Sequence, residues 1–262
     1  MAQHVSAQIQ AKLDRIDEHF ELLNDKFWAA IKEHTNHLFA PVEFDPQSGW
    51  YESNVGEFRP DTTQIAVIGG EINYQLRSIL EHLAWALVKA NHKKPIGNSR
   101  GTTFPIRATK PRDFVGETRR NGLRGVTVAA AQVIEQFQPY NTGNQSLLAI
   151  DHFAKVDRHQ SLLVTAVNVT KPEQLRPLYT INPPGSLKGF HRVVKRGQRL
   201  VPGTKIARLL FHPGVKPQVY MNGALSLAVA VTDRRGGPDS DIEGDIVEVT
   251  RLFNALKPHL GS

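Results

Sequence analysis

The feature that most constrains the fold is a pair of long segments in which apolar residues recur at helical spacing. In residues 4–36 the apolar positions step by three and four: Ile9, Leu13, Ile16, Phe20, Leu23, Phe27 and Ile31. Residues 61–91 repeat the pattern: Ile65, Ile68, Ile72, Leu76, Ile79, Leu80, Leu83 and Leu87. Since a helix buries such a stripe against other helices, both segments predict long helices of a bundle.

Shorter segments complete the expected helical part. Thr127 precedes an apolar run that stops at Pro139, which predicts a helix over 127–138, and a further helix is expected over 145–166. The Gly-, Pro- and Arg-rich stretch 92–125 predicts an irregular connection. Aromatic residues among turn-forming residues in 42–60 predict a loop or a short hairpin.

The apolar period changes after Pro172, where short strand-like runs alternate with Gly- and Pro-containing turns. The expected strands are 178–181, 190–194, 206–211, 219–221 and 225–231. An amphipathic helix over 242–257 closes the chain. The predicted fold class is therefore α+β, with an N-terminal helical bundle of about four helices, a small C-terminal antiparallel β-unit and a closing helix. The expected domains are 1–170 and 171–262.

Positive charge is concentrated in the strand-rich part. The whole chain carries a net charge of +7, yet residues 174–232 contain nine Lys and Arg and no Asp or Glu. Concentrated positive charge attracts polyanions, so RNA or another polyanion is the expected partner, although solvated surface charge is the simpler alternative. The expected nucleic-acid-binding residues are Lys188, Arg192, Lys195, Arg196, Arg199, Lys205 and Arg208.

Other functional classes are disfavoured by what the sequence lacks. The chain has no Cys, which excludes disulfides, thiolate metal sites and Cys nucleophiles. It has no N-terminal secretory pattern and no apolar run of about 20 residues, so a cytoplasmic location without membrane contact is expected. The Gly-rich loops that bind nucleotides are missing as well, so no cofactor is expected.

Two polar clusters interrupt apolar helical patterns. In the first, Arg77 and Glu81 share one side of the 61–91 helix, with His82 at its edge. In the second, the string Asp-Arg-His (157–159) follows a segment that is apolar nearly all round and is therefore expected to be buried. Because buried charges need partners, the two clusters are expected to meet. An internal ion-pair network that only orients two helices explains the same pattern.

Four strings support a resemblance. Leu-Arg-Ser-Ile-Leu-Glu-His (76–82), Thr-Phe-Pro-Ile (103–106), Gln-Pro-Tyr (138–140) and Asp-Arg-His-Gln (157–160) occur in this order. They resemble a family of bacterial and phage proteins, without an assigned activity, that carries Leu-Arg-Ser-x-Leu-Asp-His, Phe-Pro-Ile, Gln-Pro-Tyr and Asp-Lys-His-Arg. The resemblance spans roughly residues 65–165. Here Glu81, Arg158 and Gln160 replace the family's Asp, Lys and Arg.

The spacing of Arg77 and His82 also resembles the Arg-x4-6-His signature of the HEPN superfamily. That resemblance implies a metal-independent ribonuclease in which Arg77 stabilises the phosphate and His82 transfers a proton, with a homodimer around one cleft. The candidate catalytic residues are Arg77, His82, Glu81, Asp157, Arg158 and His159. Ser78 departs from the signature, because members often carry Asn, Asp or His there.

Two alternatives to a ribonuclease stay open. In the first, the protein is a non-catalytic binding or assembly module, and its Arg/His/Asp cluster is structural. In the second, it is a metal-dependent enzyme in which His82, His152 and His159 converge with Asp151 or Glu81. Burial of Arg77 and His82 with satisfied partners would argue against the ribonuclease, and three converging imidazoles would indicate the metal site.

Overall fold

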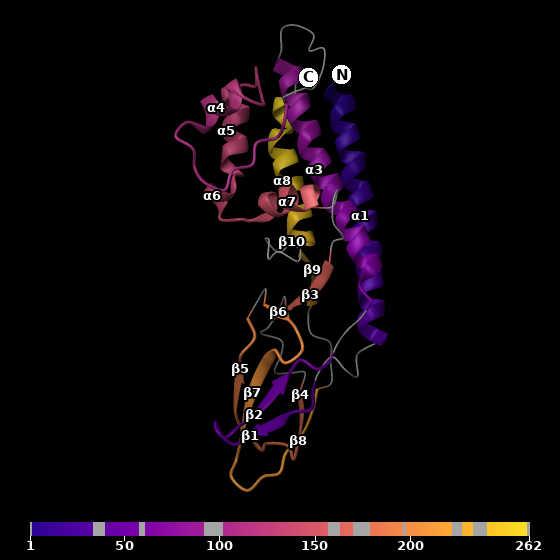
Figure 1. Ribbon diagram of the computed structural model, residues 1–262, viewed down its shortest axis with the longest axis vertical. Helices are drawn as coiled ribbons and strands as arrows, with labels where there is room; N and C mark the ends of the chain where they lie inside the picture. The colour runs from indigo at the N-terminus through magenta and orange to yellow at the C-terminus, as the bar shows by residue number, and fades with distance from the viewer. Residues whose placement is uncertain are drawn as a thin grey trace. The chain divides into compact units, whose positions relative to one another are not determined.

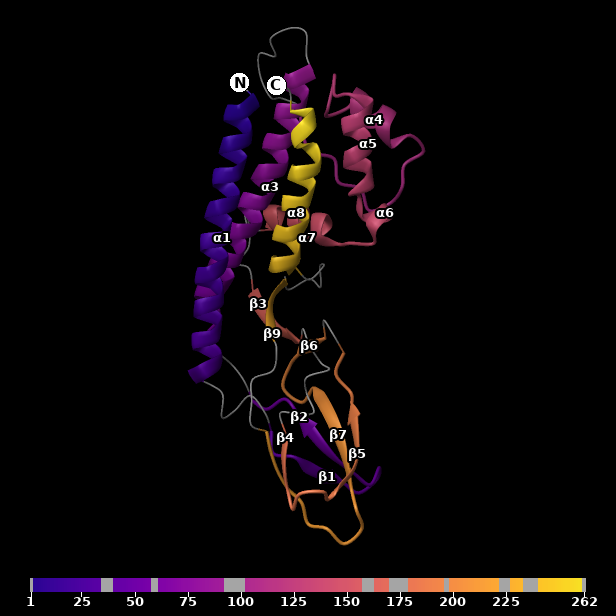
Figure 2. The ribbon, with the colours of Figure 1, turned by 180° about the vertical axis from the view of Figure 1, so that it is seen from behind.

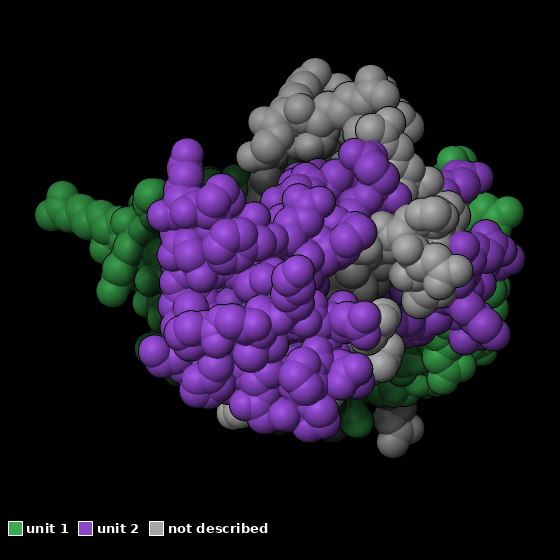
Figure 3. Space-filling view, turned by 90° about the horizontal axis from the view of Figure 1, so that it is seen from below, with its two compact units in different colours: residues 1–24, 63–163, 231–262 green, residues 25–62, 164–230 purple. Residues whose placement is uncertain are grey.

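The computed structural model describes most of the chain, and Figure 1 shows its helices and strands. The described residues are 2–33, 40–57, 61–91, 102–156, 163–169, 179–195, 198–221, 227–232 and 240–260. They form two compact units, which Figure 3 shows in different colours. Unit 1 comprises residues 1–24, 63–163 and 231–262, and unit 2 comprises residues 25–62 and 164–230. The predicted α+β class, with a helical N-terminal region, a small antiparallel sheet and a closing helix, is confirmed.

The division into units differs from the expected boundary between residues 170 and 171. Residues 25–62 fall into unit 2 because strand β2 (Trp50–Asn54) pairs with β7 (Lys205–Phe211). The closing helix α8 (Ile242–Leu256) falls into unit 1 because it packs against the helices there. Both differences come from contacts between residues far apart in the sequence, which a linear pattern does not encode.

Unit 1 is built around helix α3 (Thr63–Asn91), which packs against α7 (Ser146–Val156) and α8. Figures 1 and 2 both show residues 2–24 of α1 (Ala2–Glu33) running beside α3. The shorter helices are α4 (Phe114–Arg120), α5 (Val128–Gln136) and α6 (Pro139–Thr142), and a 3-10 turn, Lys257–His259, follows α8. Leu76, Ile79, Leu80, Leu83 and Leu87 of α3 are fully buried, as the apolar stripe predicts.

Two expectations for this region are wrong. The stretch 92–125, expected to be irregular, contains α4, whose first turn is capped by the Asp113 carboxylate accepting from Gly116 N at 2.8 Å. The helix expected over 145–166 is present as α7 (Ser146–Val156), but residues 163–166 of the expected span belong to strand β3 (Leu163–Val169). That strand is rich in β-branched residues, which favour extended backbone.

Unit 2 contains a four-stranded antiparallel sheet in the order β1-β2-β7-β5, so β1 (Glu43–Asp45) and β5 (Leu187–Arg192) are its edges. Its register aligns Tyr51 with Leu209 and Phe190, and aligns Glu52 with Arg208 and His191. Since side chains alternate along a strand, these two rows lie on opposite faces of the sheet.

The Tyr51 row faces the core of unit 2. Leu209 is fully buried, the Tyr51 and Phe211 rings lie 5.0 Å apart, and the Tyr179 ring lies 5.7 Å from that of Phe190. Tyr179 belongs to β4 (Tyr179–Asn182), which pairs with β8 (Gln218–Met221), and its hydroxyl donates to Ser53 Oγ at 3.0 Å. The remaining strands are β6 (Arg199–Leu200), which pairs with β3, β9 (Leu227–Thr232) and β10 (Ser240–Asp241).

A search of the described helices for a membrane span finds no segment with the length and apolar character required.

Candidate functional site

The Arg77 guanidinium is the centre of a charged network in unit 1, and its side chain is only 18% exposed. Its Nη2 lies 2.6 Å from Glu81 Oε1, one helical turn along α3, and its Nε lies 3.5 Å from Asp151 Oδ1 on α7. The same Nη2 donates to Thr103 Oγ1 at 3.3 Å. The expected Arg77–Glu81 pair is therefore present, and Asp151 supplies a second carboxylate from another helix.

Glu81 connects this network to the extended segment that follows residue 101. Its Oε1 accepts from Thr103 Oγ1 at 3.0 Å, and its Oε2 accepts from the Phe104 backbone N at 3.2 Å. The Phe104 side chain is 2% exposed. Glu81 is thus held on one side by a cation and on the other by two donors of this segment, an arrangement that satisfies both carboxylate oxygens.

Gln138 attaches the same extended segment to α5 and α6. Its amide Nε2 donates to Pro105 O at 3.0 Å, its Oε1 accepts from Arg107 N at 2.8 Å, and the residue is fully buried. Three of the four strings that support the family resemblance therefore form one connected network of hydrogen bonds. Sequence reasoning noted these strings but did not identify Thr103 and Gln138 as the residues that join them.

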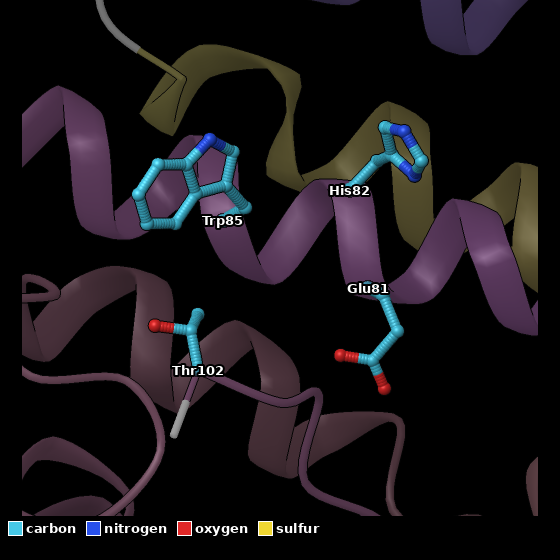
Figure 4. Close-up of a pocket in the computed structure, with 4 residues that line it drawn as sticks. All are labelled: Glu81, His82, Trp85 and Thr102. Atoms are coloured by element: carbon cyan, nitrogen blue, oxygen red, sulfur yellow. The ribbon is translucent and has the colours of Figure 1, made fainter. Parts of the chain in front are cut away.

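The His82 side chain extends from α3 in a different direction from the side chains of the Arg77 network. Its Nδ1 lies 2.6 Å from the Ser78 backbone O, one turn earlier, and because a carbonyl only accepts, this nitrogen carries a proton and donates. Figure 4 shows the His82 ring and the Glu81 carboxylate extending from opposite sides of the helix. Ser78 Oγ, beside His82, accepts from Lys12 Nζ of α1 at 3.0 Å. The structure does not bring the Arg77 and His82 side chains together.

An open hollow of about 500 Å³ lies beside this part of α3. Glu81, His82, Trp85 and Thr102 contribute to its wall (Figure 4). The Glu81 carboxylate on this wall is already satisfied by Arg77, Thr103 and Phe104.

The second cluster lies outside the described residues, which end at Val156 before resuming at Leu163. The expected roles of Asp157, Arg158 and His159 therefore stay predictions. His152, one of the three histidines of the metal hypothesis, lies on α7, and its ring is 5.2 Å from that of Phe153. Within the described ranges, no three His, Cys, Asp or Glu side chains are grouped so that they could hold a metal ion.

Two of the expected nucleic-acid-binding residues in unit 2 are paired with a carboxylate. Lys205 Nζ and Arg208 Nε lie 2.5 Å and 3.1 Å from Glu52 Oε1, and the Glu52 side chain is only 13% exposed. Glu52 comes from the β1–β2 hairpin, far from the basic segment in sequence, which is why the sequence did not reveal it. This pairing reduces the charge that Lys205 and Arg208 offer to a ligand.

The edge strand β5 and the residues after it carry a second group of cations, which we call the basic edge. It consists of Lys188, His191, Arg192 and Lys195, all exposed to solvent. No carboxylate in the described part of the chain forms an ion pair with Lys188, Arg192 or Lys195. Of the other expected residues, Arg199 lies on β6 and Arg196 falls outside the described residues.

One further titratable group is buried in unit 1. Asp245 of α8 is 1% exposed, and burial raises its pKa to about 7, with the carboxyls of Asp241 and Glu248 acting in the same direction. Hydrogen bonds from the hydroxyls of Ser240, at 2.6 Å, and Ser146 oppose this shift. Sequence reasoning missed Asp245, because it stands in an ordinary acidic first helical turn.

Comparison of the chain with models of protein families, with curated proteins and with solved structures finds no match.

Proposed function

We propose that the protein binds RNA through the basic edge of unit 2 and that the Arg77 network of unit 1 is structural rather than catalytic. The observation that supports this proposal most directly is the contrast between the two groups of cations. Arg77 is held by Glu81 and Asp151, whereas the basic edge has no described carboxylate partner. Exposed cations that no carboxylate neutralises are what a phosphate backbone attracts.

Charge on an edge strand has a second use, because it discourages pairing with the edges of other sheets. That use does not account for the complete lack of Asp and Glu across residues 174–232. A segment without acidic residues favours a polyanion over a long stretch of surface. The choice of RNA among polyanions follows the HEPN resemblance of the helical part.

Arg77 is poorly placed to stabilise a phosphate. A phosphate approaching its guanidinium would meet the Glu81 and Asp151 carboxylates, which pair with Nη2 and Nε and repel a further negative charge, while Nη1 is buried without a hydrogen-bond partner. His82, the partner expected in a ribonuclease, is directed to another side of α3. These contacts favour a network that fixes α3, α7 and the segment 102–107 together. Metal-independent cleavage of RNA through Arg77 and His82 stays a prediction.

The basic edge is tested by removing three of its charges together. In the variant Lys188→Gln/Arg192→Gln/Lys195→Gln, the affinity for a fluorescently labelled single-stranded RNA is expected to fall at least tenfold at moderate salt. Because each phosphate contact contributes about 0.7 to the slope of log affinity against log salt, the slope should become shallower by about 2. Fluorescence anisotropy over a series of salt concentrations measures both quantities.

A control with the same change in net charge is Lys89→Gln/Lys110→Gln/Arg112→Gln, which removes three exposed cations of unit 1. It is expected to lower the affinity less than threefold, because these charges act only through the long-range potential. Equal losses in the two variants would show that net charge, and not the basic edge, governs binding.

A further inference from the structure

The inference developed here rests on the proposed RNA binding and concerns Trp50 of β2. Trp50 lies on the sheet face opposite the core row of Tyr51, and it is partly exposed. A Cβ built on Gly189 of β5 would lie 3.7 Å from Trp50 Cη2 and 3.6 Å from Leu210 Cβ. The Trp50 ring therefore reaches across β7 to the backbone of the edge strand, where the basic edge lies.

The residues around the ring form two parallel rows on this face. One row is apolar and contains Trp50, Leu210 and Gly189. The neighbouring row is polar and contains Glu52, Arg208 and His191. A partly exposed indole above an apolar floor, with a guanidinium and an imidazole in the next row, provides a surface on which a flat base can stack.

Charge on this face changes from one edge of the sheet to the other. Glu43 and Asp45 of β1 face Glu52 and Trp50, so the β1 side is acidic. At the β5 edge, His191 lies on this face, whereas Arg192 pairs with Ala207 on the Tyr51 side of the sheet; both are exposed, as is Lys188, so this edge is basic. A nucleic acid strand that follows β5 with its phosphates would direct its bases inward, toward Trp50 and away from the carboxylates.

We propose that a base of single-stranded RNA stacks on Trp50 while the adjoining phosphates contact the basic edge. Stacking requires an unpaired base with a free face, so this arrangement selects single-stranded over double-stranded RNA. Gly189 belongs to the same site, because it has no side chain that would stand between the ring and a strand lying along β5.

The substitution Trp50→Leu tests the stacking, since Leu keeps apolar contact with Leu210 but offers no aromatic face. The affinity for single-stranded RNA is expected to fall about tenfold, the size of effect found when a stacking aromatic is removed. The affinity for duplex RNA and the salt dependence should stay at the wild-type values, because no charge changes. Trp50→Phe, which keeps an aromatic face, should retain most of the affinity.

A second readout does not depend on the folding of the Leu variant. In a Trp28→Phe/Trp85→Phe background, Trp50 is the one remaining of three tryptophans, and single-stranded RNA is expected to quench its fluorescence. Wild-type affinity in Trp50→Leu, or unchanged Trp50 fluorescence on binding, would overturn the inference while the basic-edge variant still tests the proposed function. Failure of the unmodified protein to bind any RNA would overturn both.

Discussion

Arg77→Met is expected to lower the free energy of unfolding by about 2–4 kcal/mol, because it leaves the Glu81 and Asp151 carboxylates without their shared cation. The side chains of Glu81 and Asp151 are 35% and 23% exposed, so water recovers part of the loss. Thr103 also loses the donor at 3.3 Å. Urea unfolding followed by the helical circular-dichroism signal measures the change.

The matched control is Arg15→Met on α1. Arg15 pairs with Glu18 one turn along the helix, at i,i+3 where Arg77 and Glu81 are at i,i+4, but both side chains are more than 60% exposed. The expected loss there is below about 1 kcal/mol, which is typical of solvent-exposed ion pairs. Similar losses in Arg77→Met and Arg15→Met would contradict the structural interpretation of the Arg77 network.

The second large effect is a pH dependence that Asp245 introduces. An Asp carboxyl in the unfolded chain has a pKa near 3.9, and the folded protein raises the pKa of Asp245 to about 7. Below about pH 4 the Asp245 carboxyl is protonated in both the folded and the unfolded state, so it does not lower the free energy of unfolding. As the pH rises from about 4 to about 7, the unfolded state has released this proton while the folded state still holds it. The free energy of unfolding therefore falls over this range and levels off above about pH 7. The difference between the two pKa values corresponds to about 4 kcal/mol.

Asp245→Asn is expected to remove this loss, because an amide keeps the hydrogen-bonding capacity toward Ser240 and Ser146 without ionising. The variant should match the wild type near pH 4 and exceed its stability by up to about 4 kcal/mol near pH 8. Asp17→Asn on the exposed surface of α1 is the control. Identical pH profiles of unfolding for the wild type and Asp245→Asn would show that the buried carboxyl does not titrate in this range.

The parts of the fold that could be predicted are those written in local patterns. The stripe from Ile65 to Leu87 predicts α3, and the short runs after Pro172 predict the C-terminal strands, because burial on one face leaves a period in the sequence. α4 was missed because its capping residue, Asp113, stands in a stretch dominated by Gly, Pro and Arg, which usually marks a loop.

Contacts between distant segments could not be predicted in the same way. The hairpin of β1 and β2 pairs with β7 about 150 residues later, and only this pairing brings Glu52 to Lys205 and Arg208. At the candidate site, the i,i+4 spacing predicted the Arg77–Glu81 pair. Nothing in that spacing indicated that Asp151 and Thr103 would join it, because both arrive by tertiary packing.

We propose that the protein binds RNA without cleaving it through Arg77 and His82. The most direct measurement is to incubate purified protein with end-labelled single-stranded RNA in EDTA and to analyse each sample on native and denaturing gels. An Arg77→Lys/His82→Ala variant, checked for folding, serves as the comparison. The proposal predicts RNA that is shifted on the native gel and intact on the denaturing gel with both proteins. Fragments produced by the wild type and absent with the variant would contradict it and establish a metal-independent ribonuclease.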